Sequence, residues 1–199
     1  MSKKKSLAVQ AVAMLAVVLT AATAWGDEQA EAIAALEKAG AKITGDKSIV
    51  NLSKTSATNA TLVHLKHLPR IQTLNLTGTE VTDAGLKELV PLQNLVALYM
   101  TEKMTDAGLK ELSSLKSLSY VWLNDTQVTD AGLKDLALIK KLDNVNLSGT
   151  KVTDAGLKEL ANLKQLKLLY LGRLPVSDAG VKELVGLQNS RCWICAGPG

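Results

Sequence analysis

The feature that most constrains this chain is a short motif that recurs along most of its length. Five segments closely follow the pattern V-T-D-A-G-L-K-E-L, and their aspartates are Asp83, Asp106, Asp130, Asp154 and Asp178. Successive aspartates are 23, 24, 24 and 24 residues apart, and a degenerate copy places Asn59 another 24 residues earlier. Self-similarity at a fixed period of about 20–50 residues indicates a repeat architecture, in which similar units stack along one axis.

Each unit divides into a strand and a short helix. In the unit that begins at Leu142, alternation predicts that Val145 and Leu147 point inward and that the residues between and after them point outward. Three leucines then follow at a spacing of three, on one side of a short helix: Leu157, Leu160 and Leu163. Neither piece can bury its apolar side alone, so neighbouring units are expected to stack and bury it together.

The strand part resembles the leucine-rich repeat signature L-x-x-L-x-L-x-x-N/T-x-L over residues 47–190, about six repeats. It is most similar to the bacterial "VTDAGL" type, which is similar to the repeats of F-box leucine-rich repeat proteins. The resemblance implies an α/β fold: a leucine-rich repeat solenoid, built as a right-handed curved ribbon with parallel strands on the concave face and short helices on the convex face.

The chain departs from the usual repeat at one column. Such repeats usually carry Asn or Cys where this chain has threonine, so a threonine ladder is expected in place of the asparagine ladder: Thr79, Thr126 and Thr150. Leu174 interrupts even that column, which puts the turn of the sixth unit in doubt. The third unit is one residue short, at Thr101-Glu-Lys-Met104.

The first 26 residues are typical of a signal peptide. Lysines at positions 3–5 precede an uncharged run over 7–22, and small residues then allow cleavage after residue 24 or 26. An uncleaved anchor helix is the alternative, but the run is short and contains Gln10 and Thr20. We therefore expect a secreted or periplasmic protein with no stable membrane span after cleavage.

Charge argues against a nucleic-acid partner. The formal charge is +4, and removal of the signal peptide takes away three lysines and no acid, which leaves +1. A column of lysines runs along the helices from Lys87 to Lys182, and each lysine is followed by an acid. Adjacent columns of opposite charge predict a neutral, solvated helix face and not a phosphate-binding stripe.

Both ends of the repeat region are expected to differ from the units between them. Residues 27–52 predict an N-terminal cap: a helix over 27–39 that stops at Gly40, and a hairpin that leads into the first repeat strand. Residues 191–199 predict an incomplete closing strand and a tail without a polar cap. An uncapped end favours self-association.

The aspartate column favours a structural role over a metal. An Asp just before a helix accepts a bond from a free backbone N–H, so helix capping is predicted for Asp83, Asp106, Asp130, Asp154 and Asp178. Calcium needs about six or more oxygens, and one carboxylate per unit is too few. His64 and His67 also lack further ligands nearby in the sequence, so no metal and no cofactor are expected.

The aromatic residues carry the functional signal. The chain has no Phe, and four of its six Trp and Tyr residues fall on outward strand positions: Tyr99, Tyr120, Trp122 and Tyr170. Because adjacent strands lie about 4.8 Å apart, Tyr99 and Trp122 are expected to be neighbours. The other outward positions are uncharged: Thr73, Asn75, Thr77, Ala97, Thr101, Asn124, Asn144, Asn146 and Ser148.

A neutral polar surface with an aromatic patch suits a protein, a peptide or a glycan, because amphipathic aromatics are the usual anchors of binding surfaces. The predicted ligand-binding set is Tyr99, Tyr120, Trp122, Tyr170, Asn75, Asn124 and Asn146. The alternative interpretation is that the rings stack only to stabilise the sheet, and both can hold. The sequence thus predicts a non-catalytic binding protein without catalytic residues.

Two other functions remain open as alternatives. One is a structural unit that self-associates through the uncapped C-terminal end. The other is a thiol oxidoreductase at Cys192-Trp-Ile-Cys195, the only C-x-x-C of the chain. The repeat register places these two cysteines on opposite faces of a strand, where they cannot bond to each other, so the thiol enzyme is disfavoured.

Overall fold

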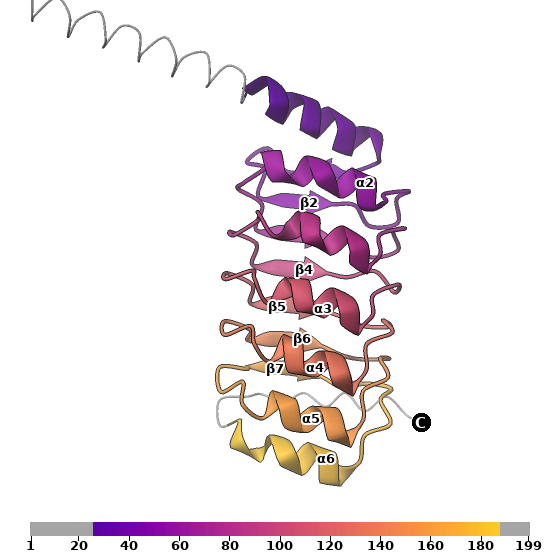
Figure 1. The fold of residues 1–199 in the computed structure, drawn as a ribbon, viewed down its shortest axis with the longest axis vertical. Coiled ribbons are helices and arrows are strands. Elements are labelled where there is room, and N and C mark those ends of the chain that lie inside the picture. Colours follow the sequence, from indigo (N-terminus) through magenta and orange to yellow (C-terminus); the bar gives the residue numbers. More distant parts are fainter. Residues whose placement is uncertain (1–25, 188–199) are drawn as a thin grey trace, which may run out of the picture.

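The computed structural model describes residues 26–187, which form one seven-stranded sheet with helices on one side of it (Figure 1). The strands are β1 (Lys42–Ile43), β2 (Ile49–Asn51), β3 (Thr73–Asn75), β4 (Ala97–Tyr99), β5 (Tyr120–Trp122), β6 (Asn144–Asn146) and β7 (Leu168–Tyr170). They lie side by side in chain order, and every pair from β2 to β7 is parallel. Residues 24 positions apart in the sequence therefore lie opposite each other on neighbouring strands. Between β4 and β5, where the unit is one residue short, the offset is 23 residues.

The helical segments stack in a second layer (Figure 1). They comprise an N-terminal helix over 26–38, α2 (Asn59–Leu62), η1 (Val63–His67), η2 (Asp83–Leu89), α3 (Asp106–Leu112), α4 (Asp130–Leu136), α5 (Asp154–Leu160), α6 (Asp178–Lys182) and η3 (Glu183–Gly186). One strand and one helical layer per repeat confirm the α/β solenoid that the sequence predicts. The strands present a continuous surface on the other side, which we call the strand face.

The core lies between the two layers. The middle residue of each strand from β2 to β7 is buried, as in Leu98, Val121 and Val145, and the helix leucines meet it from the other side. A buried leucine contributes about 1.5–3 kcal/mol relative to an exposed one, and each repeat supplies several. The stacked units therefore share one continuous interior, and no single coil could bury its leucines alone.

The N-terminal end is covered by the helix and hairpin that the sequence predicts there. The helix over 26–38 buries Leu36 completely, and β1 pairs antiparallel with β2. Gly40 adopts φ +94°, and the Ala41 N–H donates to Leu36 O at 2.9 Å, which closes the helix. A glycine at this left-handed position avoids the steric cost that a side chain would pay.

The aspartate column does not cap its own helices, which corrects the prediction. Asp83, Asp106, Asp130 and Asp154 bridge to the next coil instead. At Asp178, too, the N-cap is the preceding residue, Ser177. The N-cap residue is the preceding threonine or serine, such as Thr105 in α3. Asp83 accepts the Thr105 backbone N–H at 3.0 Å and its hydroxyl at 2.6 Å. The same pair of bonds recurs from Asp106, Asp130 and Asp154 to the next coil.

The glycine of the D-A-G motif makes this bridge possible. A Cβ on Gly108 would lie 2.5 Å from Asp83 Oδ1 and 2.9 Å from Leu86 Cδ1, so only glycine fits beneath the carboxylate of the preceding coil. Asn59 occupies the first place in the column. Its Oδ1 accepts the Thr82 N–H at 2.9 Å, and its amide donates to the Thr82 hydroxyl at 2.9 Å, which reverses the direction of the second bond. The motif is therefore one interlocking unit, in which each coil holds the start of the next helix.

The threonine ladder forms as predicted. The buried hydroxyls of Thr79, Thr126 and Thr150 each donate to the carbonyl three residues earlier at 2.7 Å. Leu174, which takes this place in the sixth unit, is partly buried and packs against the core. A buried hydroxyl that keeps a backbone carbonyl paired can replace the wider amide of asparagine.

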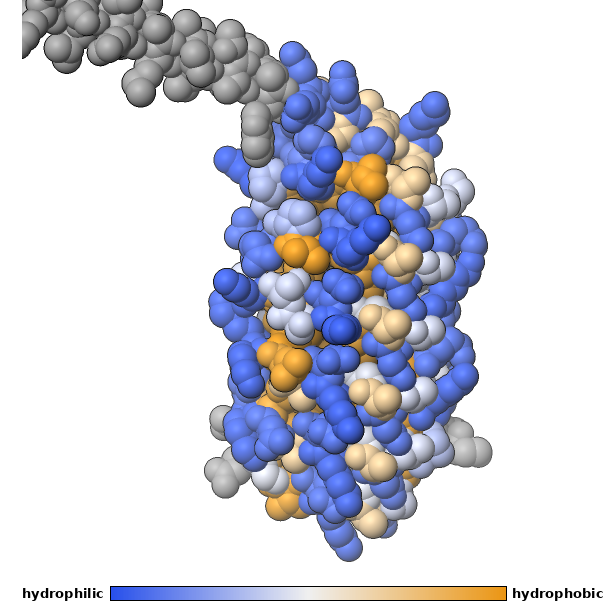
Figure 2. All heavy atoms as spheres, in the orientation of Figure 1, coloured by the Kyte–Doolittle hydropathy of each residue, from blue (hydrophilic) through white to orange (hydrophobic). Residues whose placement is uncertain are grey.

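The helix side is mainly hydrophilic, with hydrophobic side chains interrupted by polar ones (Figure 2). Exposed apolar residues at the helix ends include Val90, Leu138 and Val185. Over residues 26–187 the structure contains no helix with the length and apolar character needed to cross a bilayer. The predicted signal peptide falls almost entirely on residues 1–25, which lie outside the described residues.

Candidate binding face

The predicted aromatic patch forms on the strand face. Register pairs Tyr99 of β4 with Trp122 of β5, and their ring centroids are 4.7 Å apart with planes at 19°. Tyr120, two residues before Trp122, stacks on it at 6.0 Å and 9°. The three rings therefore form one cluster, which we call the aromatic cluster: Tyr99, Tyr120 and Trp122. Such stacked pairs contribute about 0.5–1.5 kcal/mol each beyond the area they bury.

Tyr170 lies on the strand face but stands apart from the aromatic cluster. It pairs in register with Asn146, and Asn146 pairs with Trp122, so an asparagine separates the two aromatic residues. The sequence correctly predicts the face of Tyr170, and its period of 24 residues already places Asn146 between Trp122 and Tyr170. The predicted patch consequently consists of three stacked rings and one further ring two strands away.

The outward asparagines have a structural task that the sequence did not reveal. Asn75 Oδ1 accepts the N–H of Thr77 at 3.0 Å, and Asn146 Oδ1 accepts the N–H of Ser148 at 2.9 Å. Each bond supports the turn after its strand. The amide N–H groups of these asparagines are not used in these bonds. The Asn124 amide donates to Asp125 Oδ2 at 3.3 Å. Among the predicted ligand contacts, Asn75 and Asn146 therefore keep their amide N–H groups as donors, while each oxygen already accepts one backbone N–H.

Two positions expected to point outward are buried. Thr101 is 0% exposed, because the third unit is one residue short and its hydroxyl turns inward to donate to Thr79 O at 3.1 Å. Asn144 is 4% exposed, although its register partners Tyr120 and Leu168 stand on either side of it on the strand face. Alternation gives the face of a side chain, but the size of its neighbours decides its exposure.

A polar network lies beside Asn144, at the edge of the sheet where β5, β6 and β7 begin. Asp143 accepts the Ser119 hydroxyl at 2.8 Å, the Asn144 amide at 2.5 Å and the Lys167 ammonium at 2.9 Å. Burial raises the pKa of Asp143, but the bonds from Lys167, Ser119 and Asn144 outweigh it, so the pKa lies below its usual value. Asp143 is therefore an ionised centre that ties three coils together.

One atom in this region has no partner. Asn144 Oδ1 is buried, and no hydrogen bond reaches it from any described residue. Leaving a buried acceptor unpaired costs about 1–3 kcal/mol, and most buried polar groups in proteins are satisfied. Sequence reasoning placed Asn144 among the surrounding neutral residues and missed it as a candidate contact. Only the burial by neighbouring coils distinguishes it from the other outward asparagines.

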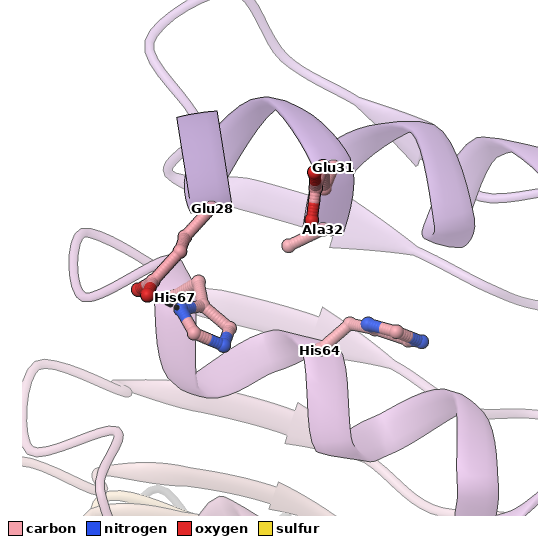
Figure 3. A pocket seen from close by; sticks show the side chains of 5 residues that line it. All are labelled: Glu28, Glu31, Ala32, His64 and His67. Carbon is pink, nitrogen blue, oxygen red and sulfur yellow. Dashed lines mark ion pairs between the residues drawn. The ribbon is translucent and has the colours of Figure 1, made fainter. Parts of the chain in front are cut away.

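A second polar cluster lies where the N-terminal helix meets the first coil (Figure 3). Glu28 and Glu31 of that helix and His64 and His67 of η1 line a shallow pocket, and His67 Nδ1 lies 3.3 Å from Glu28 Oε2. No acidic cluster lies near these histidines in the sequence, and the fold brings two glutamates to them. In Figure 3 the His64 ring points away from His67 and Glu28. Within residues 26–187, no three His, Cys, Asp or Glu side chains are grouped to hold a metal ion.

The other predicted features lie outside the described residues. These are the C-x-x-C at Cys192 and Cys195 and the incomplete closing strand over 191–199. The thiol-enzyme and self-association hypotheses therefore stay predictions.

Comparison with known proteins agrees with this architecture. Residues 67–90 and 140–161 match the sequence model described as a leucine-rich repeat. The fold is a leucine-rich repeat solenoid. Both matched segments contain a strand and the helix that follows it, which is the unit that the coils share.

Two solved structures of Listeria monocytogenes are similar to this leucine-rich repeat chain. Internalin C2 is 21% identical over 72% of this chain and 78% of its own, with a TM-score of 0.51. An internalin F structure is 17% identical over 72% of this chain and 52% of its own, with a TM-score of 0.44. At these identities the likeness concerns the fold alone. No curated protein matches the chain in sequence.

Proposed function

We propose that this leucine-rich repeat protein is a non-catalytic binding protein that acts outside the cytoplasm and recognises a polypeptide on its strand face. The observation that carries the proposal is the aromatic cluster, in which three stacked rings lie on a strand face whose outward strand positions carry no charge. Aromatic anchors surrounded by neutral polar groups are typical of interaction surfaces. The D-A-G-L motif further supports repeats of the bacterial "VTDAGL" type.

The ring geometry favours a polypeptide over a glycan. A sugar ring that stacks on an aromatic side chain needs a free ring face, whereas the faces of Tyr99 and Trp122 are turned toward each other at 4.7 Å. Tyr120 stacks on Trp122 in the same sense. Fewer ring faces therefore remain for a sugar to stack on. The ring edges carry a hydroxyl or an indole N–H, which suits the hydrogen-bonding groups and apolar side chains of a peptide.

Export rests on the signal sequence. Lysines at positions 3–5, the uncharged run and the small residues near 24 support removal of the first segment. Mass spectrometry of the protein purified from its native cells tests this. Cleavage predicts a chain that begins at residue 25 or 27 and is recovered outside the cytoplasm, and a full-length chain inside the cytoplasm contradicts it.

The binding proposal is tested with Trp122→Ala and Tyr99→Ala. Peptides selected on the wild-type chain are titrated against each variant, and we expect at least about a ten-fold loss of affinity, since aromatic anchors contribute about 2 kcal/mol or more. Val90→Ala, on the helix side, is the matched control and should bind as the wild type does. Unchanged affinity in both aromatic variants, with the fold intact by circular dichroism, would refute the patch.

A further inference from the structure

The buried acceptor Asn144 Oδ1 identifies the chemistry that the strand face selects. We propose that Asn144 is a specificity-determining contact, whose side-chain oxygen accepts a main-chain N–H of an extended peptide beside the aromatic cluster. This inference rests on the proposed function and adds to it the group of the partner that is recognised. The contact requires the Tyr120 side chain, which flanks Asn144 on the neighbouring strand, to turn aside.

The orientation of the amide is fixed by the polar network. Asn144 Nδ2 donates to Asp143 Oδ1 at 2.5 Å, and Asp143 is held in place by Ser119 and Lys167 as well. Reversing the amide would set two acceptor oxygens against each other, since an ionised carboxylate only accepts. Asn144 Oδ1 must therefore face away from Asp143, where no described residue donates to it.

The fold does not require an amide at this position. The same register position carries Thr73, Ala97 and Leu168 on neighbouring strands, none of which has an amide. Alanine and leucine there show that the coil closes without a polar group. A buried acceptor that is neither satisfied by the protein nor needed by its architecture indicates a group that a ligand completes.

The surroundings of Asn144 fit a peptide unit. An acceptor needs a donor, and the peptide N–H supplies one. The side chain of Lys167 is 66% exposed, and its ammonium group has three N–H donors, one of which bonds to Asp143. Lys167 can therefore also donate to a carbonyl of the bound peptide. The Lys167–Asp143 pair is neutral as a whole, which gives no preference to a charged group. Tyr120 beside it is 36% accessible, so its side chain can turn toward solvent and open the approach to Asn144.

The test uses N-methylated peptides. Twelve-residue peptides are selected on the full chain, and a peptide whose binding is lost in Trp122→Ala is synthesised with each main-chain N–H methylated in turn. We expect methylation at one position to weaken binding to the wild type about ten-fold or more, because it leaves Asn144 unpaired. The Asn144→Ala variant should bind the unmethylated peptide about ten-fold more weakly than the wild type does. The same methylation should not change the affinity of this variant any further.

Controls separate this inference from the proposed function. Asn51→Ala removes an amide on β2, whose oxygen already accepts the Ser53 N–H at 2.9 Å, and should keep wild-type affinity. Ala97 shows that alanine fits this place, and a thermal melt verifies that Asn144→Ala folds. If Asn144→Ala binds as tightly as the wild type while Trp122→Ala does not, the inference falls and the proposed function stands. If both bind normally, if no peptide can be selected, or if only glycans bind, both fall.

Discussion

Replacing Gly108 with alanine tests whether the D-A-G motif interlocks the coils. Helix propensity alone predicts that Gly108→Ala stabilises α3 by about 1 kcal/mol. The structure predicts the opposite, because the new Cβ would lie 2.5 Å from Asp83 Oδ1 and 2.9 Å from Leu86 Cδ1. The sign of the change in the free energy of unfolding therefore decides between a local and an interlocking role for the glycine.

The magnitude follows from the two ways of relieving the clash. Moving the Asp83 carboxylate would give up its bonds to the Thr105 N–H and hydroxyl, which together are worth about 3 kcal/mol or more. Keeping them forces the coils apart, and overpacking of this kind costs about 1–3 kcal/mol. Overpacking therefore costs less than breaking the two bonds. Because two contacts are close, we place the cost of overpacking near the upper end of its range of about 1–3 kcal/mol, at about 3 kcal/mol. After subtracting the helix propensity, we expect a net loss of about 2 kcal/mol.

Thermal unfolding measures this directly. A loss of about 2 kcal/mol lowers the Tm of a chain of this size by roughly 4–8 °C. Gly45→Ala is the matched control, because no atom lies within 4 Å of its new Cβ, and its Tm should not change. In an Asp83→Ala background the Gly108→Ala change should destabilise less, because only the 2.9 Å contact with Leu86 Cδ1 remains. A Tm for Gly108→Ala equal to or above that of the wild type would refute the interlock.

Three further predictions concern single interactions. Folding lowers the pKa of Asp143, so its carboxylate stabilises the native state above the unfolded pKa of about 3.9, and this stabilisation is lost as the pH falls through the folded pKa. Asp143→Asn should therefore make the free energy of unfolding depend less on pH below about pH 4. An unchanged pH dependence would contradict the network. Thr126→Val leaves Leu123 O without its hydroxyl donor and should cost about 1 kcal/mol in chemical denaturation, whereas Thr126→Ser should cost less. A larger loss in Thr126→Ser than in Thr126→Val would show that the methyl group, not the hydroxyl, matters. Arg173→Ala breaks an exposed ion pair and should change stability by less than about 1 kcal/mol, so a larger loss would give that pair a structural role.

The candidate site was only partly predictable from the sequence. The constant period brings Tyr99 beside Trp122, and alternation places both on the strand face, as the structure confirms. The period also places Asn146 between Trp122 and Tyr170. Period and alternation say nothing of rotamers, so the face-to-face stacking of the rings was not predictable. The burial of Asn144 was also missed, because it depends on its neighbours across the sheet, Tyr120 and Leu168.

The sequence by itself determined the repeat, the register of its strands, the buried leucines and the N-terminal cap, because each follows from spacing along the chain and a period of 24 residues leaves one way to stack. Tertiary structure decided which atoms meet between coils. The reach of Asp83 to Thr105 and the approach of Glu28 to His67 join residues that are far apart in sequence. Such contacts depend on the distance between stacked coils and on side-chain rotamers, and the spacing of residues along the chain predicts neither.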